Sequence, residues 1–117
     1  QTVDYIGAVQ GIPVCFDAKE CNADTFPLQN VHEHQIRFME KFEQQGGIAF
    51  LLIYYTAREE LYYMQYRQIR RFWDRAEAGG RKSFRLDELE PDWFMKLQNG
   101  FFIPYLDSIQ KDLDTRD

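Results

Sequence analysis

The sequence predicts an α/β domain in which helices flank a mixed β-sheet, and three observations lead to that fold class. Two β-prone runs near the N-terminus are separated by Gln10-Gly11, which predicts a hairpin. Residues 48–56 are almost uniformly apolar, as expected for a strand covered on both faces. Two segments with helical spacing of their apolar or aromatic residues flank the central strands, and each ends at a pair of glycines.

The pattern predicts the order ββαββα, followed by an irregular tail with a last helix. The hairpin strands are expected at 2–9 and 12–20, where the turn residues separate β-branched and aromatic runs. The composition of 22–29, with Asn, Asp, Thr and Pro, predicts a loop. The remaining elements are expected as follows: a helix at 30–45, strands at 48–56 and 61–66, a helix at 66–78, a short strand at 83–86, an irregular or single-turn segment at 91–97, and a helix at 101–112.

Length and composition place limits on the class of protein. The chain has 117 residues, of which 44% are hydrophobic, so we expect one domain over 1–117. This composition excludes intrinsic disorder, collagen-like sequence and a disulfide scaffold, and Cys15 and Cys21 are expected to be reduced thiols. No apolar run approaches the roughly 20 residues of a membrane span, and no export signal is evident. We therefore expect a cytoplasmic protein without a membrane partner.

The net charge of −5 is distributed unevenly along the chain. Residues 87–117 hold eight acids and three bases and account for all of it, whereas residues 1–86 hold eleven of each sign. Within the first part, residues 58–85 carry eight bases and only four acids. The acidity is local, so the overall charge does not exclude a nucleic-acid partner.

Charged residues within the second predicted strand are the main candidates for chemistry. Strand alternation puts Asp17 and Lys19 on one face and Glu20 on the opposite one. If the hairpin turns at about Gly11, Asp4 of the first strand lies near Asp17. Two carboxylates suit Mg²⁺, and a neighbouring lysine can stabilise charge on a phosphate. A salt bridge on an exposed sheet face has the same spacing, so the spacing leaves both interpretations open.

Asp4 followed by Asp17-Ala18-Lys19 resembles the PD-(D/E)XK nuclease signature. A longer set of strings resembles the RecU family of bacterial Holliday-junction resolvases and extends over essentially the whole chain. These strings are Thr2-Val3-Asp4-Tyr5-Ile6-Gly7, Phe16-Asp17-Ala18-Lys19-Glu20, Thr25-Phe26-Pro27-Leu28, His32-Glu33-His34-Gln35, Gly46-Gly47, Tyr62-Tyr63 and Ala78-Gly79-Gly80-Arg81-Lys82-Ser83. The resemblance implies a PD-(D/E)XK (restriction-endonuclease-like) core. It also implies that the family's N-terminal segment and basic stalk precede the point where this chain starts.

The resemblance further implies a set of site residues. Asp4, Asp17, Lys19 and Gln35 would be catalytic, with Lys19 stabilising the transition state. Thr2, Asp4, Asp17 and Gln35 would form the metal site, which would hold Mg²⁺, with Mn²⁺ as a substitute. Many family members have Glu where this chain has Asp17, so the side chain at this position is shorter by one methylene group.

The function implied is that of a Mg²⁺-dependent, structure-selective endonuclease that resolves four-way DNA junctions in recombination and repair. The family would act as a homodimer, because a two-fold enzyme fits two symmetric cuts. Recombinase and branch-migration proteins would be further partners. Two alternatives stay open: another PD-(D/E)XK DNA nuclease, and a non-catalytic junction-binding regulator of recombination.

Basic residues of the second predicted helix and of the glycine loop after it are candidates for DNA contacts. Arg67, Arg71, Arg81 and Lys82 are the predicted phosphate ligands. Arg67 and Arg71 belong to a helical ridge that also includes Arg70 and Arg75. A solvated helix face would have the same pattern.

Overall fold

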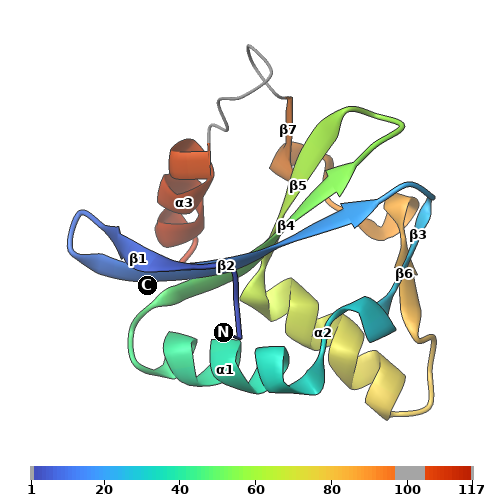
Figure 1. Cartoon of the computed structure of the whole chain (residues 1–117), viewed down its shortest axis with the longest axis horizontal. Coiled ribbons are helices and arrows are strands. Elements are labelled where there is room, and N and C mark those ends of the chain that lie inside the picture. Colours follow the sequence, from blue (N-terminus) through green and yellow to red (C-terminus); the bar gives the residue numbers. More distant parts are fainter. Residues whose placement is uncertain (1, 97–104, 117) are drawn as a thin grey trace.

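The computed structural model describes residues 2–96 and 105–116. Within them the chain forms a five-stranded sheet in the order β1-β2-β4-β5-β7 and a two-stranded sheet of β3 and β6 (Figure 1). The strands are β1 Tyr5–Val9, β2 Ile12–Cys21, β3 Thr25–Pro27, β4 Ile48–Tyr55, β5 Glu60–Gln65, β6 Ser83–Arg85 and β7 Phe94–Lys96. The helices are α1 Glu33–Gln44, α2 Tyr66–Glu77 and α3 Tyr105–Asp114, and the 3₁₀ turns are η1 Leu28–Asn30, η2 Leu86–Glu88 and η3 Pro91–Trp93.

The large sheet is mixed, as the sequence predicts. β1 and β2 form the antiparallel hairpin, and β4, β5 and β7 also pair in antiparallel fashion. The pairing of β2 with β4 is parallel, and it requires a crossover from one end of the sheet to the other. The crossover contains β3, η1 and α1; α1 packs against β4, and its Gln35 bonds to side chains of β2.

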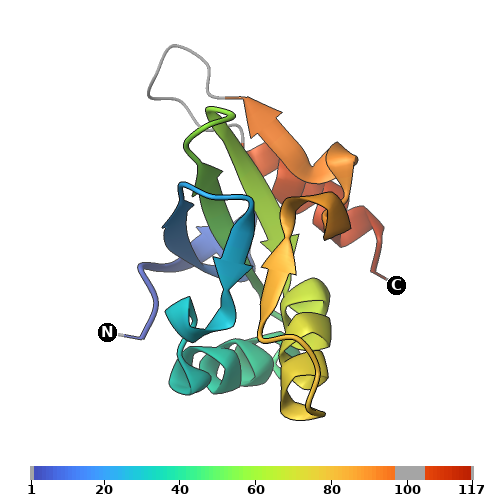
Figure 2. The same cartoon turned by 90° about the vertical axis from the view of Figure 1, so that its right-hand side faces the viewer.

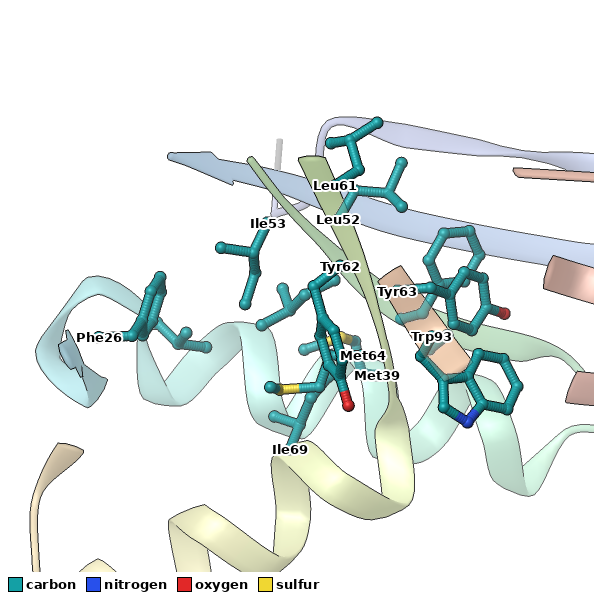
Figure 3. Packing of buried hydrophobic residues seen from close by; sticks show 14 of the residues in the cluster. Phe26, Met39, Leu52, Ile53, Leu61, Tyr62, Tyr63, Met64, Ile69 and Trp93 are labelled. Carbon is teal, nitrogen blue, oxygen red and sulfur yellow. The ribbon is translucent and has the colours of Figure 1, made fainter. Parts of the chain in front are cut away.

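The helices divide between the two faces of the sheet. Helices α1 and α2 cover one face and α3 lies on the other (Figure 1). Strand β4 is buried along nearly its whole length, which confirms that it is covered on both sides. Figure 3 shows the result in the core: Met39 of α1 and Ile69 of α2 lie on one side of strand β5. Tyr63 and Trp93 stack on its opposite side, with ring centroids 5.3 Å apart.

The prediction of a loop over 22–29 is wrong in part, because residues Thr25–Pro27 form strand β3. This strand pairs with β6, and Phe26 lies opposite Phe84 with ring centroids 4.9 Å apart. Phe72 of α2 stacks on Phe84 from the other side, at 4.7 Å. Burial of these three rings holds the small sheet against α2, and the partner strand lies too far along the chain for local composition to indicate it.

Other boundaries differ by a few residues. Helix α1 begins at Glu33, after the separate turn η1. Part of the segment predicted as irregular, 91–97, is the edge strand β7, which pairs with β5. The last helix, predicted over 101–112, is α3 from Tyr105 to Asp114, and residues 101–104 lie outside the described residues.

Cys15 and Cys21 are free thiols, as predicted. Both are buried, and burial, reinforced by the negative charge of Glu43, raises the pKa of Cys15 to about 12. No helix among residues 2–96 and 105–116 is both long enough and apolar enough to cross a bilayer.

A buried carboxylate attaches α3 to the sheet. Asp112 is fully buried and accepts hydrogen bonds from Tyr63 Oη at 2.6 Å and Gln65 Nε2 at 2.7 Å. Arg116 Nε donates to the same carboxylate at 2.9 Å, and Arg116 Nη2 donates to Glu43 Oε2 at 3.0 Å. Burial and the adjacent Asp112 raise the pKa of Tyr63. The network therefore joins α3 to β5 and to the end of α1.

Removal of this carboxylate should destabilise the fold. Asp112→Ala leaves Tyr63 and Gln65 with unpaired buried donors, so we expect the free energy of unfolding to fall by about 3 kcal/mol. The matched control is Asp114→Ala on the exposed side of the same helix, for which we expect a change within about 0.5 kcal/mol. Urea denaturation followed by circular dichroism measures both. Equal stabilities of the two variants would contradict this role.

The ion pair between α2 and η2 predicts a pH dependence of stability. Arg75 Nη1 lies 2.6 Å from Glu88 Oε1 and lowers the pKa of Glu88 to about 2, from its ordinary value of 4.5. A lowered pKa in the folded state means that this contribution is present above pH 4.5 and is lost as the pH falls towards about 2. We expect Glu88→Gln to melt below the wild type at neutral pH. Thermal melts at decreasing pH should show the difference in melting temperature shrinking between pH 4.5 and about 2. A difference that stays constant would contradict the assignment.

Candidate active site

Strand β2 presents Asp17 and Lys19 on the face of the sheet that α1 covers. Parallel pairing places them beside Leu51 and Ile53 of the buried strand β4. Lys19 Nζ lies 2.9 Å from Asp17 Oδ2, and Asp17 is only 5% exposed. A buried charge is tolerated when it is paired in this way. The predicted shared face is therefore present, and the pair is not a salt bridge on an exposed surface.

The hairpin brings Asp4 to Asp17. Its register pairs Tyr5 with Phe16, so the residue before Tyr5 comes opposite Asp17. The main-chain N–H of Asp4 donates to Asp17 Oδ1 at 2.9 Å, and the N–H of Ala18 donates to Asp4 Oδ2 at 2.8 Å. Each carboxylate is bound by the main chain of the opposite segment, which holds the two acids side by side.

Gln35 connects these groups through both ends of its amide. The side chain is 6% exposed, in the first turn of α1. Its Oε1 accepts from Lys19 Nζ at 3.3 Å and from the N–H of His32 at 3.2 Å. Its Nε2 donates to the carbonyl oxygen of Thr2 at 2.9 Å and to Asp17 Oδ2 at 3.2 Å. The contact with His32, the N-cap residue, is half of a capping box, so one side chain both starts the helix and orders the site.

The structure thus brings together all five residues that the resemblance places in the catalytic and metal sets. Thr2 takes part through its carbonyl oxygen, which any residue type would provide. The N–H groups of Ala18 and His32 are contributions that sequence reasoning missed, because every non-proline residue carries such a donor. The spacing His32-x-x-Gln35 is the one signal that could have indicated the capping contact.

The donor atoms fit a hard divalent cation. The carboxylates of Asp4 and Asp17 are adjacent, and the carbonyl oxygen of Thr2 belongs to the same hydrogen-bonded group. Mg²⁺ in proteins takes oxygen ligands, needs only one or two carboxylates, and completes its shell with water and phosphate oxygens. In the part of the chain that the structure describes, no group of three or more His, Cys, Asp or Glu side chains is arranged so that it could hold a metal ion. These donors are oxygen atoms, which hard divalent cations take as ligands, whereas a structural zinc site uses nitrogen and sulfur ligands.

The four predicted DNA contacts do not form a single cluster. Arg67 lies at the beginning of α2, and Arg81 and Lys82 follow its end; a 12-residue helix, about 18 Å long, separates them. Arg67, Arg71, Arg81 and Lys82 are all exposed. Arg81 makes one long contact with Glu88, at 3.5 Å. Arg67 Nε also donates to Gln65 Oε1 at 3.2 Å, so exposure, rather than a lack of partners, is what the four side chains share.

The other two arginines of the ridge are engaged within the protein. Arg70 pairs with Glu40 at 3.2 Å and with Asp74 at 2.9 Å, which joins α2 to α1. Arg75 pairs with Glu88 and donates to the carbonyl oxygen of Ser83 at 2.7 Å. The ridge therefore divides into two structural arginines and two exposed ones.

Comparison with known proteins supports the interpretation of this geometry. A protein-family model described as "RecU: Recombination protein U" matches residues 1–111. Proteins named "Holliday junction resolvase RecU" are similar to the chain. The one from Pediococcus pentosaceus is 39% identical over 112 residues, which cover 94% of this chain and 56% of that protein. The one from Staphylococcus saprophyticus is 40% identical over 105 residues, covering 89% and 47%, and the one from Bacillus subtilis is 46% identical over 90 residues, covering 76% and 43%.

The chain spans about half the length of the curated relatives that it matches. The family model nevertheless matches nearly all residues of this chain, from the acids of the hairpin to the last helix. The chain belongs to the RecU family.

Proposed function

We propose that this protein is a divalent-metal-dependent endonuclease that resolves four-way DNA junctions in recombination and repair. The observation that carries the proposal is the hydrogen-bonded group of Asp4, Asp17, Lys19 and Gln35 in a chain of the RecU family. Residues 1–117 would act as a single nuclease domain. The names of the relatives support the substrate, and the paired acids with a neighbouring lysine support the chemistry.

In this proposal Asp4 and Asp17 hold Mg²⁺, or Mn²⁺ in its place, with the carbonyl oxygen of Thr2 and the amide of Gln35 beside them. The metal, when bound, supplies an activated water and neutralises charge on the scissile phosphate. Lys19 contributes a fixed positive charge next to that phosphate, because Asp17 and Gln35 both hold its ammonium group. Gln35 is a positioning residue that keeps the acid and the lysine in one geometry.

We propose a homodimer as the active form, with one site in each subunit. Resolution needs two cuts related by a two-fold axis, and a two-fold enzyme provides them. Arg67, Arg71, Arg81 and Lys82 would contact phosphates of the junction arms, since all four are exposed. Recombinase and branch-migration proteins are further proposed partners, and the proposed location is the cytoplasm.

Loss of the Asp17 charge tests the reaction. We expect Asp17→Asn to reduce Mg²⁺-dependent cleavage of a labelled four-way junction by at least about a hundredfold, while gel-shift assays show unchanged junction binding. Glu20→Gln is the matched control, because Glu20 lies exposed on the same strand and should cut normally. Normal cleavage by Asp17→Asn would refute the assignment. Equal rates of the wild type on junction, duplex and flap DNA would instead favour another nuclease of the superfamily.

Removal of the Gln35 amide tests its positioning role. Gln35→Ala deprives Lys19 and Asp17 of a shared partner, so we expect cleavage to fall about 10- to 100-fold. The Mg²⁺ concentration that gives half-maximal cleavage should also rise. Gln44→Ala, an exposed position at the other end of α1, is the control and should leave both quantities unchanged. A lower rate at an unchanged Mg²⁺ requirement would limit Gln35 to helix capping.

A further inference from the structure

A groove of about 500 Å³ lies between the C-terminal half of α2 and the corner formed by β3 and η1. Figure 2 shows that end of α2 beside the small sheet. Trp73 and Ala76 line the groove from α2, Pro27 and Leu28 line it from the corner, and Lys82 lies at the edge. Its volume is within the range of small-molecule sites, and its walls are mainly apolar.

The two tryptophans of the chain have different surroundings. Trp93 is 6% exposed, stacks on Tyr63 and has Lys111 Nζ 4.2 Å from its ring centroid. Trp73 is only partly buried, and no ring of the described residues stacks on it. An indole at the wall of an apolar groove is a stacking platform, and a DNA base stacked on an aromatic side chain gains binding energy regardless of its identity.

The charge at the edge of the groove suits a polyanion. Lys82 is exposed, and no acidic group of the described residues pairs with it. The N–H of Leu28 donates to the carbonyl oxygen of Lys82 at 3.0 Å, which holds this part of the loop beside the groove. Glu77 also lines the groove, with Arg70 Nη2 at 3.8 Å from its carboxylate. Residues 75–85 as a whole carry four bases and one acid.

The groove is close along the chain to the candidate active site. Turn η1, which contributes Leu28, leads directly to the N-cap of α1 and to Gln35. Six residues lie between Leu28 and Gln35, so even a fully extended chain would place their Cα atoms within about 27 Å of each other. The groove and the helix start that carries Gln35 are therefore joined by one short segment of the chain.

We propose that this groove takes an unpaired nucleobase of the DNA substrate, with the base stacked on Trp73 and a neighbouring phosphate bound by Lys82. The base must be unpaired, as a base at the crossover point becomes when a four-way junction is opened, because both faces of a base in a duplex are covered by its neighbours. The inference rests on the proposed DNA function and adds a binding subsite to it.

Intrinsic fluorescence tests the subsite. Wild-type protein and Trp73→Phe are titrated with single-stranded oligodeoxythymidine and with a four-way junction, and the difference between them isolates the Trp73 signal. We expect both DNAs to quench Trp73. Trp73→Ala should bind the oligonucleotide about tenfold more weakly, whereas Trp73→Phe, which keeps an aromatic face, should bind within about twofold of the wild type. Circular dichroism melts verify that each variant is folded.

Loss of one charge provides an independent readout. Lys82→Gln should weaken binding and reduce the slope of log affinity against log salt by about one. Lys41→Gln, an exposed lysine on α1, is the control and should leave the slope unchanged. An unchanged slope for Lys82→Gln would overturn the phosphate contact and with it the subsite.

Three other outcomes decide the inference. Junction binding without a change in Trp73 fluorescence would overturn the subsite and leave the proposed function intact. Protection of Trp73 from acrylamide in the DNA-free protein would mean that another segment or a second copy fills the groove, and would also overturn it. If the protein neither binds nor cuts four-way junctions, the proposed function fails, and the oligodeoxythymidine titration alone then supports or refutes the subsite.

Discussion

The parallel pairing of β2 with β4 is the constraint on which the rest of the structure depends. It runs from Val14 opposite Ile48 to Cys21 opposite Tyr55. Parallel neighbours cannot be joined by a tight turn, so the chain must cross the sheet, and α1 makes that crossing. The crossing brings the first turn of α1 to the face that carries Asp17 and Lys19. The strand pairing thereby determines that an amide from a helix can bind charged side chains of a strand.

The polar site and the polar anchor of α3 lie on opposite faces of the same sheet. On one face, Asp17 is compensated by Lys19, Gln35 and the N–H of Asp4. On the other face, Asp112 is compensated by three donors. Burial of a charge is strongly unfavourable unless its hydrogen bonds are satisfied, so both carboxylates require this full set of partners. The buried strand β4 lies between β2, which carries Asp17, and β5, which carries Tyr63 and Gln65.

Much of the fold and of the site follows from local patterns. Alternation in 12–20 predicts that Asp17 and Lys19 share a face, and the turn at Gln10-Gly11 predicts that Asp4 approaches them; both arrangements are present. The apolar run at 48–56 and the helical segments that flank the central strands are also confirmed. The pairing of β3 with β6 was not predictable in this way, because Pro27 and its polar neighbours are typical of a loop. The roles of Arg70 and Arg75 also escaped prediction, since their acidic partners include residues on other elements.

The sequence by itself determined the order of the three helices and of strands β1, β2, β4, β5 and β6, and which charged side chains of β2 share a face. The resemblance also indicated the five residues that the structure brings together at the candidate site. These are properties of short segments, because side chains return to the same face of a strand or a helix every two to four residues. The tertiary structure decided which strands pair across long stretches of chain, which arginines stay exposed, and which main-chain groups bind the carboxylates. Such contacts join distant segments through atoms that every residue carries, and they exist only after the chain has folded.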